Sequence, residues 1–212
     1  MNNTTIILTS TVNVNLAKSH IFQKNVDSRL ETYLKSILQW LNKTSFNIVL
    51  VENSGYTFDE LNNEKDIFKD RFEVISFKES EMQQANYLKI NDSKGSSEVF
   101  AIDYAYQHSK IIHSSNFIIK ITCRYFIPEL EEYLSNFDLN NYDCLTQNNR
   151  DRCEMVGAHY NNFTFIFGLS AYFHIERIWK ERASMCDNIL VCKEFKIEKT
   201  QRGGLNEFFE TM

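Results

Sequence analysis

Three short apolar segments, separated by stretches with helical spacing, constrain the fold of this chain most strongly. Residues 5–9, 47–51 and 117–122 are rich in Ile, Val, Leu and Thr, as expected for strands buried on both faces of a parallel sheet. Residues 27–42 and 96–113 lie between them and carry apolar residues at helical spacing. This alternation predicts a parallel sheet with right-handed crossover connections.

Further elements follow from the same patterns. Residues 72–77 predict a strand, and Pro128 suits the first turn of a helix over 128–136, because proline has no N–H to leave unpaired there. The remaining expectations are a short amphipathic helix or loop at 57–70, strands at 143–146, 162–167 and 189–192, and helices at 169–185 and 205–211. The predicted fold class is α/β: a mixed, mainly parallel central sheet flanked by helices, with residues 1–212 forming one domain.

Composition excludes several classes of protein. The net charge of −5 argues against a protein that binds duplex nucleic acid, which needs a basic surface. No run of 18 apolar residues predicts a membrane span, and the apolar start lacks the basic residues of a signal peptide. Five scattered cysteines fit free thiols in a reducing compartment, so we expect a cytoplasmic protein.

Motifs of other α/β proteins are missing from the sequence. It has no GxGxxG, no GxxxxGK[ST], no GxSxG and no HExxH. These absences disfavour a dinucleotide-binding Rossmann site, a P-loop, an α/β-hydrolase and a zinc protease.

Polar loops follow three of the predicted strands, at 9–13, 52–56 and 122–126. The loop Asn91-Asp92-Ser93-Lys94-Gly95 precedes a helix that leads into the third of these strands. In parallel sheets ligands bind beyond the carboxyl ends of the strands. We therefore expect these four loops to form one ligand site.

This ordered set of loops resembles the GT-A-fold nucleotide-sugar glycosyltransferases, over roughly residues 5–128. The loop at 91–95 and its helix resemble the segment before the family's sugar-nucleotide motif. The segment 118–125, Ile-Ile-Lys-Ile-Thr-Cys-Arg-Tyr, stands where the family carries apolar residues and Asp-x-Asp. It is also similar to the Lys-x-x-Gly-Arg-Tyr strand end of small viral and bacterial glycosyltransferases that build surface glycans.

The resemblance implies a set of residues that bind the nucleotide-sugar. By this resemblance Thr9, Ser10, Thr11 and Val12 flank the base and ribose, Glu52 and Asn53 read the nucleobase, and Lys94, Gly95 and Glu98 lie near the ribose or diphosphate. The open alternative for 52–55 is a simple turn.

The same alignment replaces the family's two metal-binding acids with Thr122 and Arg124. Those acids usually hold Mn²⁺ or Mg²⁺, which neutralises the diphosphate leaving group. Arg124 offers a permanently charged fork to phosphate instead, and Lys94 and Lys120 add charge. A divalent metal therefore stays an open alternative. Because a lysine inside a central strand is unusual, we expect Lys120 to face a cleft or the sheet edge. Arg124 has a second interpretation, a surface ion pair with Glu129 or Glu131.

Two further segments carry candidate residues. The segment 150–159 mixes acids, bases and a histidine, and its Asp151 and Glu154 are the candidate bases that deprotonate an acceptor hydroxyl. His159 is a candidate phosphate partner or metal ligand, and Arg202, before two glycines, is a candidate anion contact at a helix start. The alternatives are a solvated charged loop, a structural histidine and a flexible linker.

The favoured function is a glycosyltransferase of the hexosyltransferase class, with a nucleotide-sugar half at 1–128 and an acceptor half at 129–212. It would transfer a sugar from a UDP-linked donor to a glycan or glycoconjugate, including glycoproteins. A sugar nucleotidyltransferase is disfavoured because residues 9–13 lack its glycine-rich basic loop. A non-catalytic domain that binds a nucleotide or glycan is the third alternative.

Overall fold

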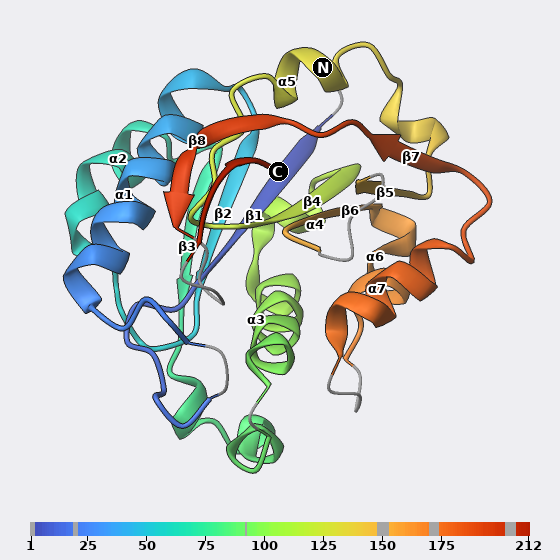
Figure 1. The fold of residues 1–212 in the computed structure, drawn as a ribbon. Helices are drawn as coiled ribbons and strands as arrows, with labels where there is room; N and C mark the ends of the chain where they lie inside the picture. The colour runs from blue at the N-terminus through green and yellow to red at the C-terminus, as the bar shows by residue number, and fades with distance from the viewer. Residues whose placement is uncertain (1–2, 19–20, 92, 148–152, 170–173, 202–206) are drawn as a thin grey trace.

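A computed structural model describes residues 3–18, 21–91, 93–147, 153–169, 174–201 and 207–212. Seven strands in this part of the chain form one sheet with the order β3-β2-β1-β4-β6-β5-β7 (Figure 1). The sheet strands are β1 (Thr4–Ser10), β2 (Asn47–Glu52), β3 (Phe72–Ser76), β4 (Phe117–Thr122), β5 (Cys144–Gln147), β6 (Met155–His159) and β7 (Ile189–Cys192). A separate hairpin-like pair is formed by β8 (Lys196–Gln201) and β9 (Phe208–Thr211).

Helices connect these strands. The α-helices are α1 (Val26–Lys43), α2 (Asn62–Ile67), α3 (Lys94–His108), α4 (Lys110–His113), α5 (Leu130–Leu134), α6 (Phe163–Phe167) and α7 (Ile175–Ala183). Short 3-10 helices lie at Asp59–Leu61, Glu79–Glu81, Gln83–Lys89, Leu139–Asn141 and Tyr160–Asn162. The predicted helix over 96–113 is divided at Ser109, whose side chain accepts a hydrogen bond from the Ile112 N–H and so starts α4.

The sheet is mixed and mainly parallel, which confirms the predicted fold class. β1 lies at its centre and pairs in parallel with β2 and β4, and β2 pairs in parallel with β3. β6 runs antiparallel to both β4 and β5. The carboxyl ends of β1, β2 and β4 therefore meet at one edge, where the amino end of β6 also lies.

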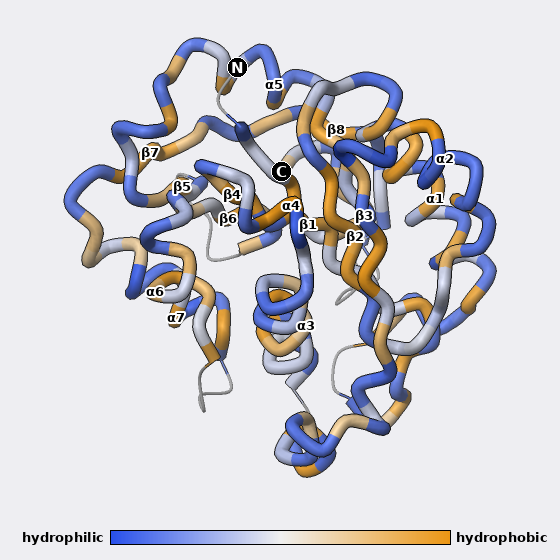
Figure 2. The backbone as a smooth tube through the Cα atoms, turned by 180° about the vertical axis from the view of Figure 1, so that it is seen from behind, coloured by the Kyte–Doolittle hydropathy of each residue, from blue (hydrophilic) through white to orange (hydrophobic). Residues whose placement is uncertain are grey.

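Two apolar clusters cover the two faces of the sheet. On one face α1 packs Tyr33, Ile37 and Trp40 against alternate residues of the strands. On the other face α3, α4, α6 and α7 pack around a second cluster, which includes Trp179. Figure 2 shows the same layers, with the apolar strands of the sheet lying between more polar helices. This arrangement explains why strands β1, β2 and β4 carry apolar residues on both of their faces.

The predicted strand at 162–167 is wrong, because this segment forms helix α6. Phe163, Ile166 and Phe167 are buried, and their spacing places them on one side of a helix. They pack against the helices of the second cluster: the Phe163 ring stacks on Tyr106 and the Phe167 ring contacts Trp179 edge-on. Burial against other helices has overridden the strand preference of Phe, Ile and Thr.

Two further differences from the predicted elements lie in the second half of the chain. Residues 155–159 form the buried strand β6, which the sequence did not predict because Gly157 and Ala158 are weak strand formers. A Cβ atom at Gly157 would lie 2.8 Å from the Phe117 ring, so close packing on β4 demands glycine here. The predicted C-terminal helix is also wrong, since residues 208–211 form β9 and pair with β8.

Membrane-spanning helices were also sought in the described residues. None of the helices there combines the length and the apolar character that a bilayer crossing requires.

Candidate functional site

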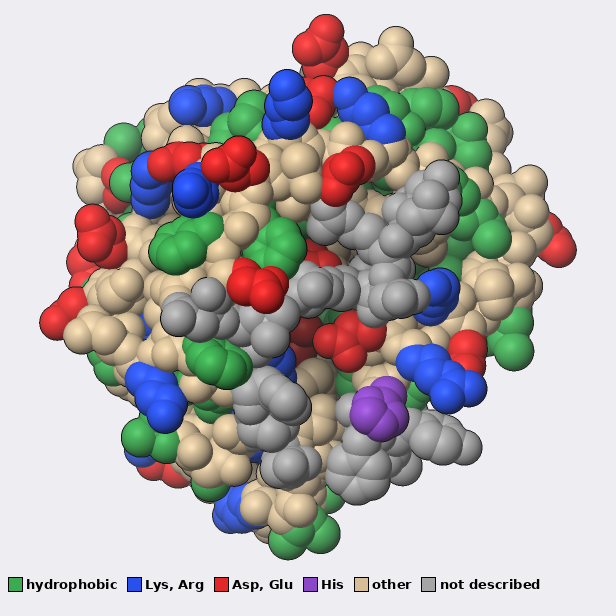
Figure 3. All heavy atoms as spheres, viewed as in Figure 1, with side chains coloured by type: hydrophobic (Ala, Val, Ile, Leu, Met, Phe, Trp, Pro, Cys, Tyr) green, Lys and Arg blue, Asp and Glu red, His purple; other side chains and the backbone are tan. Residues whose placement is uncertain are grey.

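A cavity of about 480 Å³ opens at the carboxyl ends of β1, β2 and β4. The start of α3 and the residues just before β6 complete its lining. Figure 3 shows this face hollowed near its middle, with acidic and basic side chains around the hollow. The position is the one expected for a ligand site in a parallel sheet.

Most of the residues predicted for the site meet in this cavity. Its lining includes Thr9, Ser10, Thr11, Asn53, Lys94, Gly95, Glu98, Lys120, Thr122, Arg124 and Glu154. Asp151 and Arg202 lie outside the described residues. The predicted helix start after Arg202 is not found, since residues 208–211 are a strand.

His159 is the predicted residue that the structure places far from the cavity. β6 is antiparallel to β4, so His159 pairs with Phe117 at the beginning of β4, whereas Thr122 ends that strand at the cavity. The His159 ring accepts a hydrogen bond from the Asn161 N–H, 3.2 Å away, and so caps the following turn. Its geometry is that of the structural histidine.

Glu52 lies behind the cavity wall, together with Val12, and organises two of the loops. Its fully buried carboxylate accepts hydrogen bonds from the backbone N–H groups of Val12 (2.9 Å), Ser54 (2.9 Å) and Tyr56 (2.8 Å). Burial raises the pKa of Glu52, while these hydrogen bonds act in the opposite direction. Glu52 therefore links the loop after β1 to the turn after β2. This role matches the alternative in which residues 52–55 form a simple turn.

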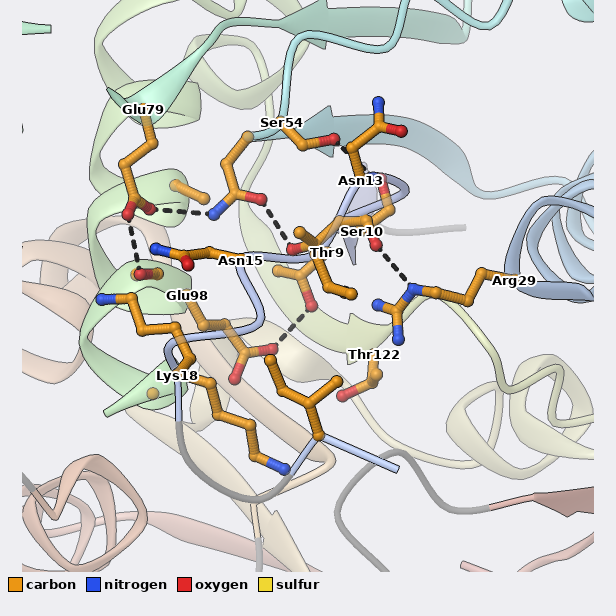
Figure 4. Close-up of a pocket in the computed structure, with 18 of the residues that line it drawn as sticks. Thr9, Ser10, Asn13, Asn15, Lys18, Arg29, Ser54, Glu79, Glu98 and Thr122 are labelled. Atoms are coloured by element: carbon orange, nitrogen blue, oxygen red, sulfur yellow. Dashed lines mark hydrogen bonds between the residues drawn. The ribbon is translucent and has the colours of Figure 1, made fainter. Parts of the chain in front are cut away.

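Five hydroxyl side chains line the cavity on the β1, β2 and α3 side, and we refer to them as the hydroxyl wall: Thr9, Ser10, Thr11, Ser54 and Ser97. Each of them donates its proton to another protein group, and Figure 4 shows the bond from Thr9 to Glu98 among these. The acceptors are Glu98 Oε1 for Thr9 (2.6 Å), the Val51 carbonyl for Ser10 (3.0 Å), Asn53 Oδ1 for Thr11 (2.6 Å), Glu52 for Ser54, and Glu79 Oε1 for Ser97 (3.0 Å).

Lys120 supplies a buried cation at the bottom of the cavity. Its Nζ lies 2.8 Å from Glu98 Oε1 and donates to the Cys153 carbonyl (2.9 Å) and to Thr122 Oγ1 (3.4 Å). It also lies 5.1 Å from the centre of the Trp179 ring. Burial by itself would raise the pKa of Glu98, but the charge and hydrogen bond of Lys120 lower it below its usual range. The prediction that Lys120 faces a cleft is confirmed.

Arg124 and Lys94 add two more cations, and with Lys120 they form what we term the cationic wall. The alternative interpretation of Arg124, a surface ion pair, is wrong, because Glu129 pairs with Lys193 at 2.6 Å and Glu131 accepts from the Ser45 N–H at 2.8 Å. Among the residues that the structure describes, Arg124 forms no ion pair, and its buried Nε has no hydrogen-bond partner. Partial burial and the nearby Arg124 lower the pKa of Lys94.

Several residues of the cavity were not predicted from the sequence, and three charged ones among them are Arg29, Lys18 and Glu79. Arg29, on the buried face of α1, donates to the Thr11 carbonyl (2.8 Å) and to the Tyr33 hydroxyl (2.6 Å). Lys18 donates to two backbone carbonyls of residues 88 and 91, and so joins the loop after β1 to the segment before α3. Glu79 accepts from Asn53 and Ser97. Of these three residues, the sequence carried a signal for Arg29 alone, because a basic residue four positions before Tyr33 on an apolar helix face is unusual.

The charge of the cavity differs from that of the whole chain. Its described lining contains six basic residues, Lys18, Arg29, Lys78, Lys94, Lys120 and Arg124, and four acidic residues, Glu79, Glu98, Glu154 and Glu176. The local surplus is thus two positive charges, in a protein whose net charge is −5. Such a surplus in a concave site favours an anionic ligand.

The residues at the end of β4 do not fit a divalent metal. Mg²⁺ and Mn²⁺ require oxygen ligands, above all carboxylates. The Glu98 carboxylate is already held by Lys120 and Thr9, and the guanidinium of Arg124 would repel a dication. Within the described ranges, no three His, Cys, Asp or Glu side chains are grouped to hold a metal ion.

Neither a protein-family model nor a curated relative matches this chain. Solved structures do match its fold. A protein from Desulfovibrio desulfuricans G20 assigned as a nucleotide-diphospho-sugar transferase aligns with a TM-score of 0.50 and 13% identity, over 91% of this chain and 80% of the other. The chain therefore has the fold of a nucleotide-sugar transferase.

Two other solved structures share this fold. Residues 1–349 of TarS from S. aureus align with a TM-score of 0.50 and 11% identity, over 91% of this chain and 58% of TarS 1–349. A cytidylyltransferase from Leptospira borgpetersenii aligns with a TM-score of 0.51 and 12% identity, over 99% of this chain and 82% of the other. At this identity the likeness concerns the fold, and the chemistry has to be argued from the cavity itself.

Proposed function

We propose that this chain is a glycosyltransferase that moves a sugar from a UDP-linked donor to a hydroxyl of a glycan or glycoconjugate. The observation that carries the proposal is the cationic wall, which lies at the carboxyl end of the central strands of a nucleotide-sugar transferase fold. A nucleotide-sugar carries a diphosphate, and its transfer reaction develops negative charge on that leaving group. Fixed cations next to the leaving group lower the barrier of such a reaction.

Arg124 is the group best suited to the diphosphate. Its guanidinium lines the cavity without an ion-pair partner among the described residues, whereas the charge of Lys120 is balanced by Glu98. A guanidinium binds phosphate oxygens through two parallel hydrogen bonds. In this proposal Arg124 and Lys94 stabilise the leaving diphosphate in the place of a metal ion, and Lys120 keeps Glu98 in position.

Glu154 is the proposed base on the acceptor side. It lies directly before β6, its carbonyl accepts from the Thr122 N–H at 3.1 Å, and it lines the cavity. An inverting transferase needs a carboxylate there to deprotonate the acceptor hydroxyl. Substitution Glu154→Gln should therefore lower kcat strongly, by about 100-fold or more, with little effect on UDP binding.

The test of the function is a thermal shift assay with UDP-, GDP-, CMP- and TDP-linked compounds, with and without Mn²⁺. We expect a rise in Tm with the UDP-linked compounds that does not require Mn²⁺ and that Arg124→Ala removes. Failure of every nucleotide to raise Tm would contradict the proposal.

A second candidate function is a sugar nucleotidyltransferase, which is favoured by the fold shared with the cytidylyltransferase. The loop after β1 argues against it, since residues 11–15 contain neither glycine nor a basic residue. The two functions differ in their products. Release of pyrophosphate from a nucleoside triphosphate and a sugar phosphate would support the second function, and release of UDP from a UDP-sugar would support the first.

A further inference from the structure

Glu79 connects the two polar side chains that line the cavity on either side of it. Its Oε2 accepts from Asn53 Nδ2 at 3.0 Å, and its Oε1 accepts from the Ser97 hydroxyl at 3.0 Å. Its backbone N–H also donates to the Asn53 carbonyl at 2.9 Å. Figure 4 shows Glu79 at one end of this row of side chains, with its hydrogen bonds drawn as dashed lines.

The chemistry of a carboxylate fixes the direction of every hydrogen bond in this row. A carboxylate can only accept, so the amide of Asn53 must turn its nitrogen toward Glu79. The Asn53 oxygen then faces Thr11, whose hydroxyl donates to it at 2.6 Å. Ser97 likewise has to give its proton to Glu79. One carboxylate thus sets the orientation of three neighbours.

The consequence concerns what the wall can offer to a ligand. A hydroxyl has one proton to donate, and Thr11 and Ser97 both donate theirs to protein acceptors. Toward the cavity these two hydroxyls can only accept. The same holds for Thr9, whose proton goes to Glu98. This side of the cavity therefore favours a ligand group that donates hydrogen bonds, while the cationic wall favours a group that only accepts them.

We propose that Glu79 is a positioning residue that makes the hydroxyl wall a receptor for the ribose hydroxyls of a ribonucleoside diphosphate. The inference rests on the proposed function and assigns the direction of the ligand within the site. The ribose 2′- and 3′-hydroxyls, which are donors, lie against Thr11, Asn53 and Ser97. The diphosphate, which has only acceptors, lies against Lys94 and Arg124. The opposite orientation would place phosphate oxygens against oxygen lone pairs.

The substitution Glu79→Gln tests this assignment with almost no change of shape. With its Oε1 accepting from Asn53, the new amide nitrogen donates to Ser97, whose hydroxyl must then turn its proton into the cavity. The wall loses an acceptor and gains a donor. Glu198→Gln is the control, because Glu198 is an exposed acid that pairs with Lys35, and neither residue is among those that line the cavity.

Isothermal titration calorimetry with UDP, CDP and GDP, their 2′,3′-dideoxy counterparts and inorganic pyrophosphate gives the readout. For the nucleotide that binds the wild type, we expect Glu79→Gln to lower affinity about tenfold. The preference for the ribose form over the dideoxy form should fall by a similar factor, while pyrophosphate binding stays the same. Glu198→Gln should change none of these values. Ser97→Ala, which removes an acceptor without changing charge, should lower nucleotide affinity about threefold to tenfold.

The outcomes separate this inference from the proposed function. If no nucleotide binds the wild-type protein, the proposed function fails and this assignment fails with it. If a nucleotide binds and Glu79→Gln and Ser97→Ala leave both its affinity and its preference for ribose unchanged, the assignment is overturned while the function stands. An equal loss for pyrophosphate and nucleotide in Glu79→Gln would reduce Glu79 to a structural role and overturn it too.

Discussion

The hydroxyl wall and the cationic wall line the same cavity, but their polar groups are partnered in different ways. Every hydroxyl of the first wall donates to a protein acceptor, and Glu79, Glu98 and Glu52 take three of the five protons. In the second wall the Lys120 charge is balanced by Glu98, whereas Arg124 has no ion pair within the described residues. The hydroxyl wall is therefore preorganised by its own hydrogen bonds, whereas the cationic wall keeps positive charge for a ligand.

Lys120→Met should have the largest effect, because it removes the ion pair between Lys120 of the cationic wall and Glu98, which accepts from the hydroxyl wall. Glu98 would remain in the cavity floor without its cation, and removal of one partner of a buried ion pair lowers the free energy of unfolding by about 3–5 kcal/mol. Urea unfolding measures this change. The control is Lys35→Met, since the Lys35–Glu198 pair is more than half exposed on both sides and should contribute less than about 1 kcal/mol. A loss below about 1 kcal/mol in Lys120→Met would show that the pair does not hold the two walls together.

Arg124→Ala should reduce kcat/KM for a UDP-sugar about 100-fold, because a charge-assisted contact to phosphate contributes about 1.5–3 kcal/mol. Lys94 remains in this variant, so some activity should persist. We expect the free energy of unfolding to change little, since Arg124 forms no ion pair with described residues. Arg177→Ala, on the exposed face of α7, is the control. Equal activities of Arg124→Ala and wild type would remove Arg124 from the site.

The pH dependence of stability tests the contribution of the Glu98 carboxylate. Its pKa is lowered in the folded protein, so its contribution is fully present above the ordinary value of 4.5 and is lost as the pH falls through the lower folded value. Glu98→Gln should therefore show a shallower loss of stability below pH 4.5 than the wild type. Urea unfolding between pH 3 and pH 7, a range of about four units that includes that value, measures the difference. Parallel curves for the two proteins would contradict it.

The smallest expected effect is that of chelation. If the cationic wall acts in place of a metal ion, as proposed, EDTA should leave turnover within about twofold of its starting value, and added Mn²⁺ should not raise it further. Initial rates with a UDP-sugar measure this directly. Loss of turnover with EDTA and its recovery with Mn²⁺ would show that a metal holds the diphosphate.

Much of the fold could be predicted from local patterns. Strands predicted at 5–9, 47–51 and 117–122 are observed at Thr4–Ser10, Asn47–Glu52 and Phe117–Thr122. Their continuous apolar character is a local consequence of burial on both faces. The polar loops at the carboxyl ends of these strands were predicted to form one site, and eleven of the predicted residues line one cavity.

The remaining elements depend on contacts between distant parts of the chain. β6 is a strand because Gly157 fits against Phe117 and Leu145, and 163–167 is a helix because its aromatic rings pack on Tyr106 and Trp179. Neither partner is visible in the local sequence. Since β6 was not predicted, its antiparallel direction was not either, and His159 was expected at the wrong edge of the sheet.

Local sequence was enough to locate the apolar strands, the polar loops at their ends, and Thr122 and Arg124 at the end of β4. Only the tertiary structure decided how these groups are partnered. Lys120 could be recognised as unusual in a strand, but its pairing with Glu98 required α3 to pack beside β4. Glu79, Asn53 and Ser97 come from three separate segments, and the direction of their hydrogen bonds is fixed only when they meet. Residue types are local properties, whereas hydrogen-bond direction and charge balance belong to the assembled cavity.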